Sequence, residues 1–222
     1  THGTIEANAV NTVLGWDIGA SDRTILHAAM FYTAGWNVFT LPLFLARATN
    51  VLIESFDSDL VLKLIGEEKI TIFFGVPTMF QMMLDSPEFD RADFTTLRFA
   101  VSGGAPLPPE VCKQFEEKTG AVIFEGYGLS ETAPVATSNP TSKEKRKIGS
   151  IGFPIPGTDI KVLDIDTGTQ ALPQGEDGEP ATRHDLATRV LFVHIPPLKG
   201  KGALPLGKQL PVLKRIVKAL GL

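Results

Sequence analysis

The chain has 222 residues, of which 43% are hydrophobic and 21% are charged, with a formal net charge of −4. This apolar content is sufficient for a sizeable globular core, and the length allows one large domain or two small ones. A single cysteine, Cys112, excludes an internal disulfide, and residues 1–8 lack the layout of a signal peptide, so we expect a cytoplasmic protein.

Stretches typical of helices and strands alternate through the first two thirds of the chain. We expect helices over residues 5–16, 36–47, 58–69, 77–83 and 109–119, and strands over 25–29, 50–53, 70–74, 97–101 and 121–124. Asp57 or Ser58 is expected to cap the third helix, with Leu60, Leu64 and Ile65 on its apolar face. This alternation predicts an α/β fold with a mostly parallel sheet flanked by helices.

The apolar stretch over residues 24–46 is about as long as a bilayer requires. Several polar residues interrupt it, as do Gly35 and Pro42, so we expect a strand, a turn and a core helix there and no membrane span.

The organisation changes twice towards the C-terminal end. Glycine and proline separate short strand-like pieces after residue 139, which indicates an α/β core to about residue 139 and a small β element over 140–179. Residues 1–179 contain 13 Lys/Arg and 24 Asp/Glu, whereas residues 180–222 contain eight basic residues and one acid. The net charge changes from −11 to +7, so we expect a domain over 1–179 and a basic tail over 180–222.

Residues 123–135 carry the most informative pattern, because an apolar strand there leads into glycine, aromatic, hydroxyl and carboxylate residues. Gly126 and Gly128 allow a ligand to approach the backbone closely. Tyr127 offers a flat face to a base, Ser130 can donate to a phosphate oxygen, and Glu131 can hold a magnesium ion. The plainer alternative is that Tyr127 only packs and Glu131 only caps the next turn.

A second glycine-rich turn lies at Ser102, Gly103 and Gly104, between a strand and a helix, where free backbone N–H groups could hold a polar ligand. Such turns are usually only structural. Ligands of parallel sheets bind beyond the carboxyl ends of the strands, so we expect Gly103, Gly104, Tyr127 and Glu131 to meet in one cleft.

Together these segments resemble the adenylate-forming (AMP-binding) enzymes, which include acyl-CoA synthetases, aryl-CoA ligases and amino-acid adenylation domains. Residues 127–131 are similar to the family's Tyr-Gly-Leu-Thr-Glu signature, with Ser130 in place of threonine. Residues 102–106 are similar to its adenine-binding loop, and residues 74–80 and 147–157 match in order. The resemblance covers residues 1–179 and implies a central piece of the large N-terminal domain.

The resemblance implies a ligase that uses ATP, Mg²⁺ and coenzyme A to convert a carboxylic acid first to an acyl-adenylate and then to a thioester, with no nucleic-acid partner. It implies that Ser130 and Glu131 are catalytic and that Glu131 is the metal ligand. The implied nucleotide-binding residues are Ser102, Gly103, Gly104, Ala105, Pro106, Glu125, Gly126, Tyr127 and Gly128.

The same resemblance implies a substrate pocket bordered by Tyr32, Trp36 and Val76. The family usually has histidine at the position of Tyr32, and Trp36 is similar to an aromatic that lines the acyl tunnel of fatty acyl-CoA synthetases. A fatty acid is therefore the first expected substrate, an aryl acid the second and an amino acid the third. Alternatively, both aromatics are core residues.

Several family features are not recognised in the chain: the phosphate-binding loop, the ribose-binding aspartate, the hinge and the C-terminal domain. We therefore expect the chain as given to be inactive alone, and a non-catalytic nucleotide-binding or interaction fragment is the alternative. Residues 210–222 are typical of a basic amphipathic helix that contacts membranes peripherally, or of an unrelated extension. The sequence does not predict the oligomeric state.

Overall fold

The computed structural model describes residues 2–164, 166–167, 170–173, 179–184 and 187–192. The amphipathic segment predicted over residues 210–222 lies outside this range. Five α-helices are described: α1 (His2–Trp16), α2 (Leu41–Leu45), α3 (Ser58–Glu67), α4 (Pro77–Asp85) and α5 (Pro109–Thr119). A π-helix, η1 (Ala34–Thr40), precedes α2, and two 3-10 turns are η2 (Phe89–Arg91) and η3 (Ser130–Thr132).

The central sheet has the strand order β3-β4-β5-β6-β7. Its members are β3 (Ile72–Gly75), β4 (Phe99–Ser102), β5 (Val122–Gly128), β6 (Val135–Ser138) and β7 (Phe153–Pro154). The first three strands are parallel, and β6 and β7 are antiparallel to their neighbours. A parallel pair, β1 (Arg23–Leu26) and β2 (Thr49–Leu52), lies beside β3. The predicted α/β fold is confirmed, with a sheet that is mixed.

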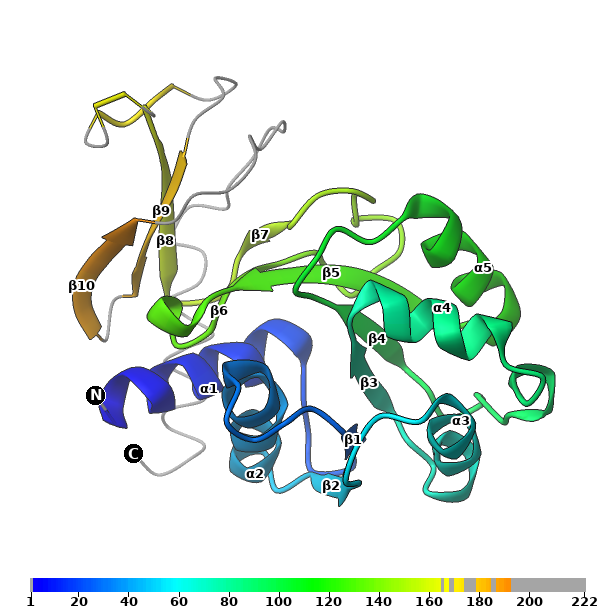
Figure 1. Cartoon of the computed structure of the whole chain (residues 1–222). Helices are drawn as coiled ribbons and strands as arrows, with labels where there is room; N and C mark the ends of the chain where they lie inside the picture. Colours follow the sequence, from blue (N-terminus) through cyan, green and yellow to red (C-terminus); the bar gives the residue numbers. More distant parts are fainter. Residues whose placement is uncertain (1, 165, 168–169, 174–178, 185–186, 193–222) are drawn as a thin grey trace.

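Two apolar clusters cover opposite faces of the parallel strands, because side chains alternate along each strand. Phe73, Ala100 and Ile123 pack against α3, α4 and α5. Their neighbours Phe99 and Phe124 pack against α1, η1 and α2. Figure 1 shows the two groups of helices on either side of the strands. This three-layer arrangement leaves the carboxyl ends of the strands accessible.

Local sequence signals set most helix ends. The Asp57 side chain accepts a hydrogen bond from the Leu60 backbone N–H at 2.8 Å, as an N-cap should. Gly120 ends α5 with a φ of 73°, which glycine adopts at low cost. The predicted apolar face of α3 is wrong in one respect: Leu60 is 41% exposed, and Val61 and Leu62 are buried with Ile65.

Two further elements differ from the prediction. The expected helix over 36–47 is a π-helix followed by a short α-helix, and the Thr40 hydroxyl donates to Gly35 O within it. The strand expected to end at residue 124 continues to Gly128, where it pairs with β6. Glycine weakens strands, so the sequence favoured a loop here, but pairing with β6 overrides that preference.

A smaller antiparallel sheet of β8 (Thr158–Leu163), β9 (Glu179–His184) and β10 (Ala187–Phe192) follows the core. Strand β9 begins at Glu179 and continues, as does β10, into residues 180–222, which the sequence assigned to the basic tail. Within the described part of the chain, no helix combines the length and apolar character required to cross a bilayer.

Candidate functional site

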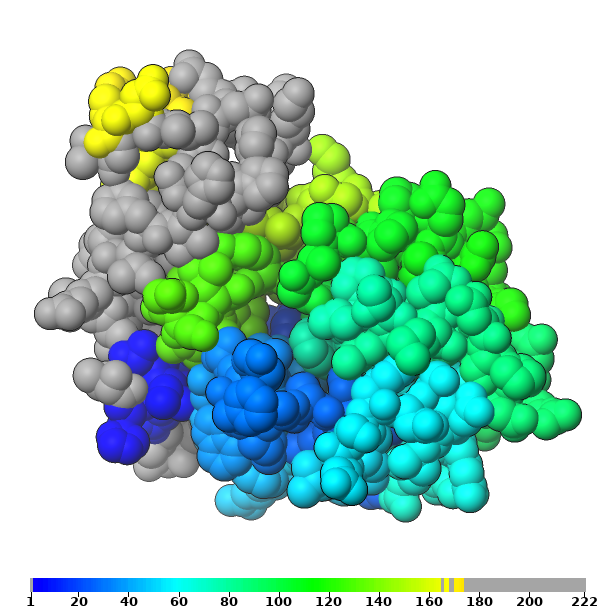
Figure 2. All heavy atoms as spheres, viewed as in Figure 1, coloured from blue at the N-terminus to red at the C-terminus, as the bar shows by residue number. Residues whose placement is uncertain are grey.

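The two glycine-rich segments lie side by side, because one follows β4 and the other forms the end of the adjacent parallel strand β5. Ser102 at the end of β4 is paired with Glu125 in β5, and the Gly103 N–H donates to Gly75 O at the end of β3. An apolar cavity of about 200 Å³ opens here, in the region where Figure 2 shows a hollow between the blue and green segments. Its lining comprises Trp16, Thr33, Ala34, Val38, Phe74, Val76, Val101, Gly103, Gly104, Gly126, Tyr127, Gly128, Pro134 and Val135.

The turn after β4 presents unused polar groups. The Ser102 hydroxyl is fully buried and has no hydrogen-bond partner. Gly104 has a φ of 82°, and Gly104, Ala105 and Pro106 are exposed. The backbone N–H groups of Gly104 and Ala105 have no protein acceptor within the described residues. Such a turn suits a polar ligand such as a nucleotide.

The Glu125 carboxylate joins two separate loops by hydrogen bonds, a structural role that the sequence did not predict. Its side chain is buried, one carboxylate oxygen accepts from the Leu107 N–H at 3.0 Å, and the other accepts from the Gly149 N–H at 3.0 Å. The carboxylate thus ties the turn after β4 and the loop at residue 149 to β5. Its place among the nucleotide-binding residues stays a prediction, and the geometry makes it a positioning residue.

Tyr127 borders the cavity with its hydroxyl buried and without a hydrogen-bond partner. Burial, followed by the nearby Glu131 carboxylate, raises the pKa of Tyr127 to about 12. The phenol therefore stays neutral at physiological pH.

Ser130 and Glu131 lie in the turn η3, which is held from the inside. The buried Thr132 hydroxyl bonds to Leu129 and Pro134 backbone groups. The Asn8 amide donates to Val135 O at 2.7 Å, and Asn8 Oδ1 accepts from the Val135 N–H at 3.1 Å. By contrast, the Ser130 and Glu131 side chains are exposed and make no hydrogen bond or ion pair within the described part. Both are available to a ligand.

The side-chain oxygens of Ser130 and Glu131 fit the binding of Mg²⁺ together with a nucleotide. Mg²⁺ prefers oxygen and is usually held by one or two carboxylates together with phosphates and water. Glu131 offers one unpaired carboxylate, and the described residues contain no group of three His, Cys, Asp or Glu side chains that could hold a metal by themselves. Glu131 would thus hold the ion jointly with a bound phosphate.

Of the three residues predicted to border the substrate pocket, one lines the cavity and two do not. Val76 lines the cavity. Tyr32 is 62% exposed and Trp36 is 41% exposed, and neither is among the lining residues. Thr33, which lies between them, is at the cavity instead. Trp16 also lines the cavity and was not predicted, because nothing in the pattern of α1 indicates which strand its last residue meets.

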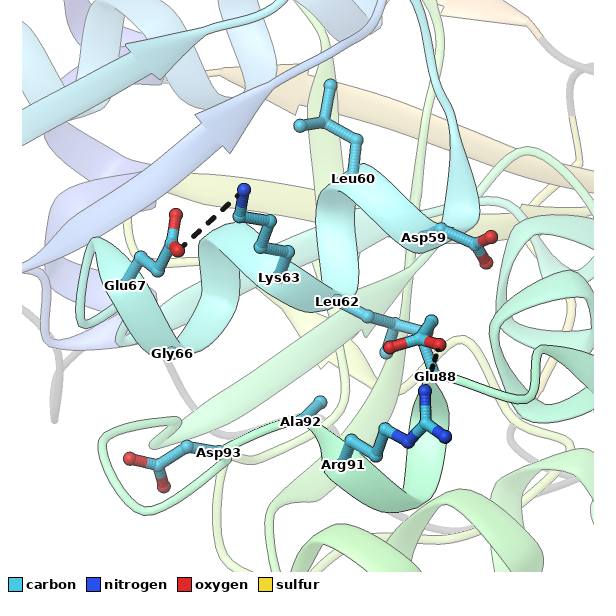
Figure 3. Close-up of a pocket in the computed structure, with 10 residues that line it drawn as sticks. All are labelled: Asp59, Leu60, Leu62, Lys63, Gly66, Glu67, Glu88, Arg91, Ala92 and Asp93. Carbon is cyan, nitrogen blue, oxygen red and sulfur yellow. Dashed lines mark hydrogen bonds and ion pairs between the residues drawn. The ribbon is translucent and has the colours of Figure 1, made fainter.

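A second hollow lies between α3 and the segment around η2 (Figure 3). Its charged side chains include the ion pairs Lys63–Glu67 at 3.8 Å and Arg91–Glu88 at 2.7 Å. None of the site residues predicted from the sequence lines this groove. The candidate site is therefore the cavity at the ends of β4 and β5.

Fold and site define a class: an α/β domain with an apolar cavity at the carboxyl ends of parallel strands, beside a glycine-rich turn. A family model described as AMP-binding enzyme matches residues 1–189. The chain belongs to this family, and the match extends ten residues beyond the boundary expected at 179.

Similar proteins are acyl-CoA and aryl-CoA ligases. A feruloyl-CoA synthase from Amycolatopsis sp. is 33% identical over 81% of this chain and 36% of its own length. A long-chain-fatty-acid–CoA ligase from Bacillus subtilis is 42% identical over 58% of this chain and 23% of its own. The crystal structure of ATP-bound MatB from Rhodopseudomonas palustris matches with a TM-score of 0.75 and 29% identity, over 86% of this chain and 36% of that one. The chain spans about a third of the length of the first relative.

Proposed function

We propose that this chain supplies the acid-binding and nucleotide-binding part of an ATP-dependent ligase that activates a carboxylic acid as its adenylate and transfers the acyl group to coenzyme A. The observation that carries the proposal is the position of the apolar cavity. It lies between the Gly103–Gly104 turn and Tyr127, next to a turn that exposes the unpaired Ser130 and Glu131 side chains. An acid in the cavity would have its carboxylate near a nucleotide held by these turns.

In the proposed reaction, a carboxylate oxygen of the acid attacks the α-phosphorus of ATP, and the bond to the β-phosphate breaks to release pyrophosphate. The thiol of coenzyme A then attacks the acyl carbon, and AMP leaves. Magnesium, when bound, neutralises phosphate charge. The chain's residues orient the reactants: the Gly104 and Ala105 N–H groups hold the nucleotide, the Tyr127 ring packs on the base, and the Ser130 hydroxyl donates to a phosphate oxygen.

The substrate is a carboxylic acid with an apolar body, for which the sequence favoured a fatty acid over an aryl acid. A second function is a nucleotide-binding fragment without turnover. It is the alternative that the sequence left open, and it would use the same turn after β4 and the same Tyr127 ring.

Equilibrium dialysis of ATP with and without Mg²⁺ tests nucleotide binding by the 222-residue chain. We expect Mg²⁺ to tighten ATP binding, and Glu131→Ala to remove most of that gain. Glu54→Ala, which changes another exposed glutamate, is the matched control and should have no effect. The absence of ATP binding by the unchanged chain would reject both functions. Acid-dependent pyrophosphate release then separates the ligase from the non-catalytic fragment.

A further inference from the structure

The turn that carries Ser130 and Glu131 is closed by its own hydrogen bonds, but these bonds do not fix where the turn lies. The Leu129 N–H donates to Pro134 O at 2.9 Å and to Thr132 Oγ1 at 3.1 Å. All of these groups belong to the short connection between β5 and β6. The position of the turn relative to the rest of the domain therefore depends on contacts with other elements.

Asn8 supplies such a contact from the middle of α1, which packs against β6 (Figure 1). The residue is 1% exposed. Its Nδ2 donates to Val135 O at 2.7 Å and to Thr132 O at 3.4 Å, and its Oδ1 accepts from the Val135 N–H at 3.1 Å. One side chain thus pairs with both backbone groups of the residue that opens β6, as a neighbouring strand would. Because Glu131 directly precedes Thr132, a shift of Thr132 moves the Glu131 carboxylate with it.

Asparagine at position 8 is unfavourable for the helix itself but suits the contact with η3. It is a weaker helix former than alanine, because its side chain competes for backbone hydrogen bonds. Burial of an amide is also unfavourable unless its polar atoms are paired, and both are paired in Asn8. Asn11 is equally buried on the same helix, but it lies beside Gly157, and its Oδ1 has no partner within the described residues. Of these two asparagines, Asn8 is the one that holds the turn.

Resting on the proposed function, we propose that Asn8 is a positioning residue for the magnesium-dependent step: it holds η3 where the Glu131 carboxylate and the Ser130 hydroxyl meet the bound phosphates. Mg²⁺ demands near-octahedral coordination, so a carboxylate that shifts with its turn loses the ion. Groups behind a metal ligand influence metal binding for this reason. Within the described residues, Asn8 makes no hydrogen bond to the turn after β4. Its loss should therefore weaken the effect of Mg²⁺ more than nucleotide binding itself.

Equilibrium dialysis of ATP against the 222-residue chain, with and without Mg²⁺, tests the proposal. We expect Asn8→Ala to lose most of the gain in ATP affinity that Mg²⁺ provides, as Glu131→Ala does. ATP binding without Mg²⁺ should stay within about twofold of that of the unchanged chain. Asn11→Ala is the matched control, because it removes a buried amide from the same helix. This control should keep the gain from Mg²⁺ even where its stability falls.

Amide hydrogen exchange tests the placement of η3 without any nucleotide. In Asn8→Ala the Val135 N–H loses its acceptor, so its exchange should be about tenfold faster than in the unchanged chain, and Asn11→Ala should leave it unaltered. If circular dichroism finds Asn8→Ala misfolded, Asn8→Asp decides. Its carboxylate has the size of the amide but cannot donate to Val135 O. We expect this variant to lose the gain from Mg²⁺ as well, although its added negative charge would by itself attract the ion.

Several outcomes would overturn the proposal. A gain from Mg²⁺ that survives in the Asn8 variants would do so, as would an equal loss in Asn11→Ala, unaltered exchange at Val135, or ATP binding by the unchanged chain with no gain from Mg²⁺. If the unchanged chain does not bind ATP at all, the proposed function fails. Hydrogen exchange alone then decides whether Asn8 holds the turn.

Discussion

Replacing Glu125 distinguishes a positioning role from ligand contact within residues 123–135. Its carboxylate accepts one hydrogen bond from the N–H of Leu107, which is 4% exposed, and one from Gly149, which is exposed. Water can replace the second partner but not the first. A hydrogen bond to a charged acceptor contributes about 1.5–3 kcal/mol, so Glu125→Ala should lower the free energy of unfolding by about 2–3 kcal/mol.

Glu125→Gln should behave differently, because its amide oxygen can still accept from Leu107 while its NH₂ group faces the exposed Gly149 side. We expect a loss of less than about 1 kcal/mol for this variant. Urea denaturation of the 222-residue chain measures both changes. Glu131→Ala, which removes an exposed carboxylate in the same segment, should change the unfolding free energy by no more than about 0.5 kcal/mol.

Dialysis of AMP completes the comparison. Glu125→Ala should weaken AMP binding severalfold, because the turn after β4 loses its link to β5, whereas Glu125→Gln should retain it. Equal losses of stability for the Ala and Gln variants, or a stability of Glu125→Ala within about 0.5 kcal/mol of the unchanged chain, would refute the reasoning that the Leu107 bond dominates.

Three further outcomes follow from the structure. Gly128→Ala should lower the free energy of unfolding by more than about 2 kcal/mol, because a methyl group there would overlap Pro134 O. An unchanged midpoint of urea denaturation would contradict the close approach of β5 and the Pro134 segment. Burial lowers the pKa of His27 from its ordinary value of 6.5, although its Nε2 donates a hydrogen bond to Phe74 O, so the unfolded chain binds the proton more readily. The free energy of unfolding should therefore fall as the pH drops through 6.5, and it should fall less in His27→Gln. An equal pH dependence in the unchanged chain and in His27→Gln would show that another group is responsible. With its pKa raised to about 12, Tyr127 should ionise only in strong alkali, so it contributes stability that is lost as the pH rises from 10 towards 12. Ultraviolet titration should show ionisation of a phenol near pH 12 in the unchanged chain and not in Tyr127→Phe.

Local chemistry let the sequence predict much of the fold. Asp57 caps α3, Pro77 opens α4 and Gly120 ends α5, since each depends only on nearby backbone groups. The order of helices and strands likewise predicted the α/β class. The glycine-rich turns were recognisable because their composition is unusual for a strand or a helix.

Tertiary structure alone decided how the site is assembled. Pairing with β6 carried β5 through Gly128, and folding brought Trp16 and Thr33 to the cavity while leaving Tyr32 and Trp36 exposed. The bonds from Glu125 to Leu107 and Gly149 join segments 18 and 24 residues apart. Periodicity indicates which residues share a face of one element, but which elements meet depends on how all of them pack together. The sequence therefore determined the chemical groups available to this protein, and long-range packing determined which of them line the cavity and which hold it in shape.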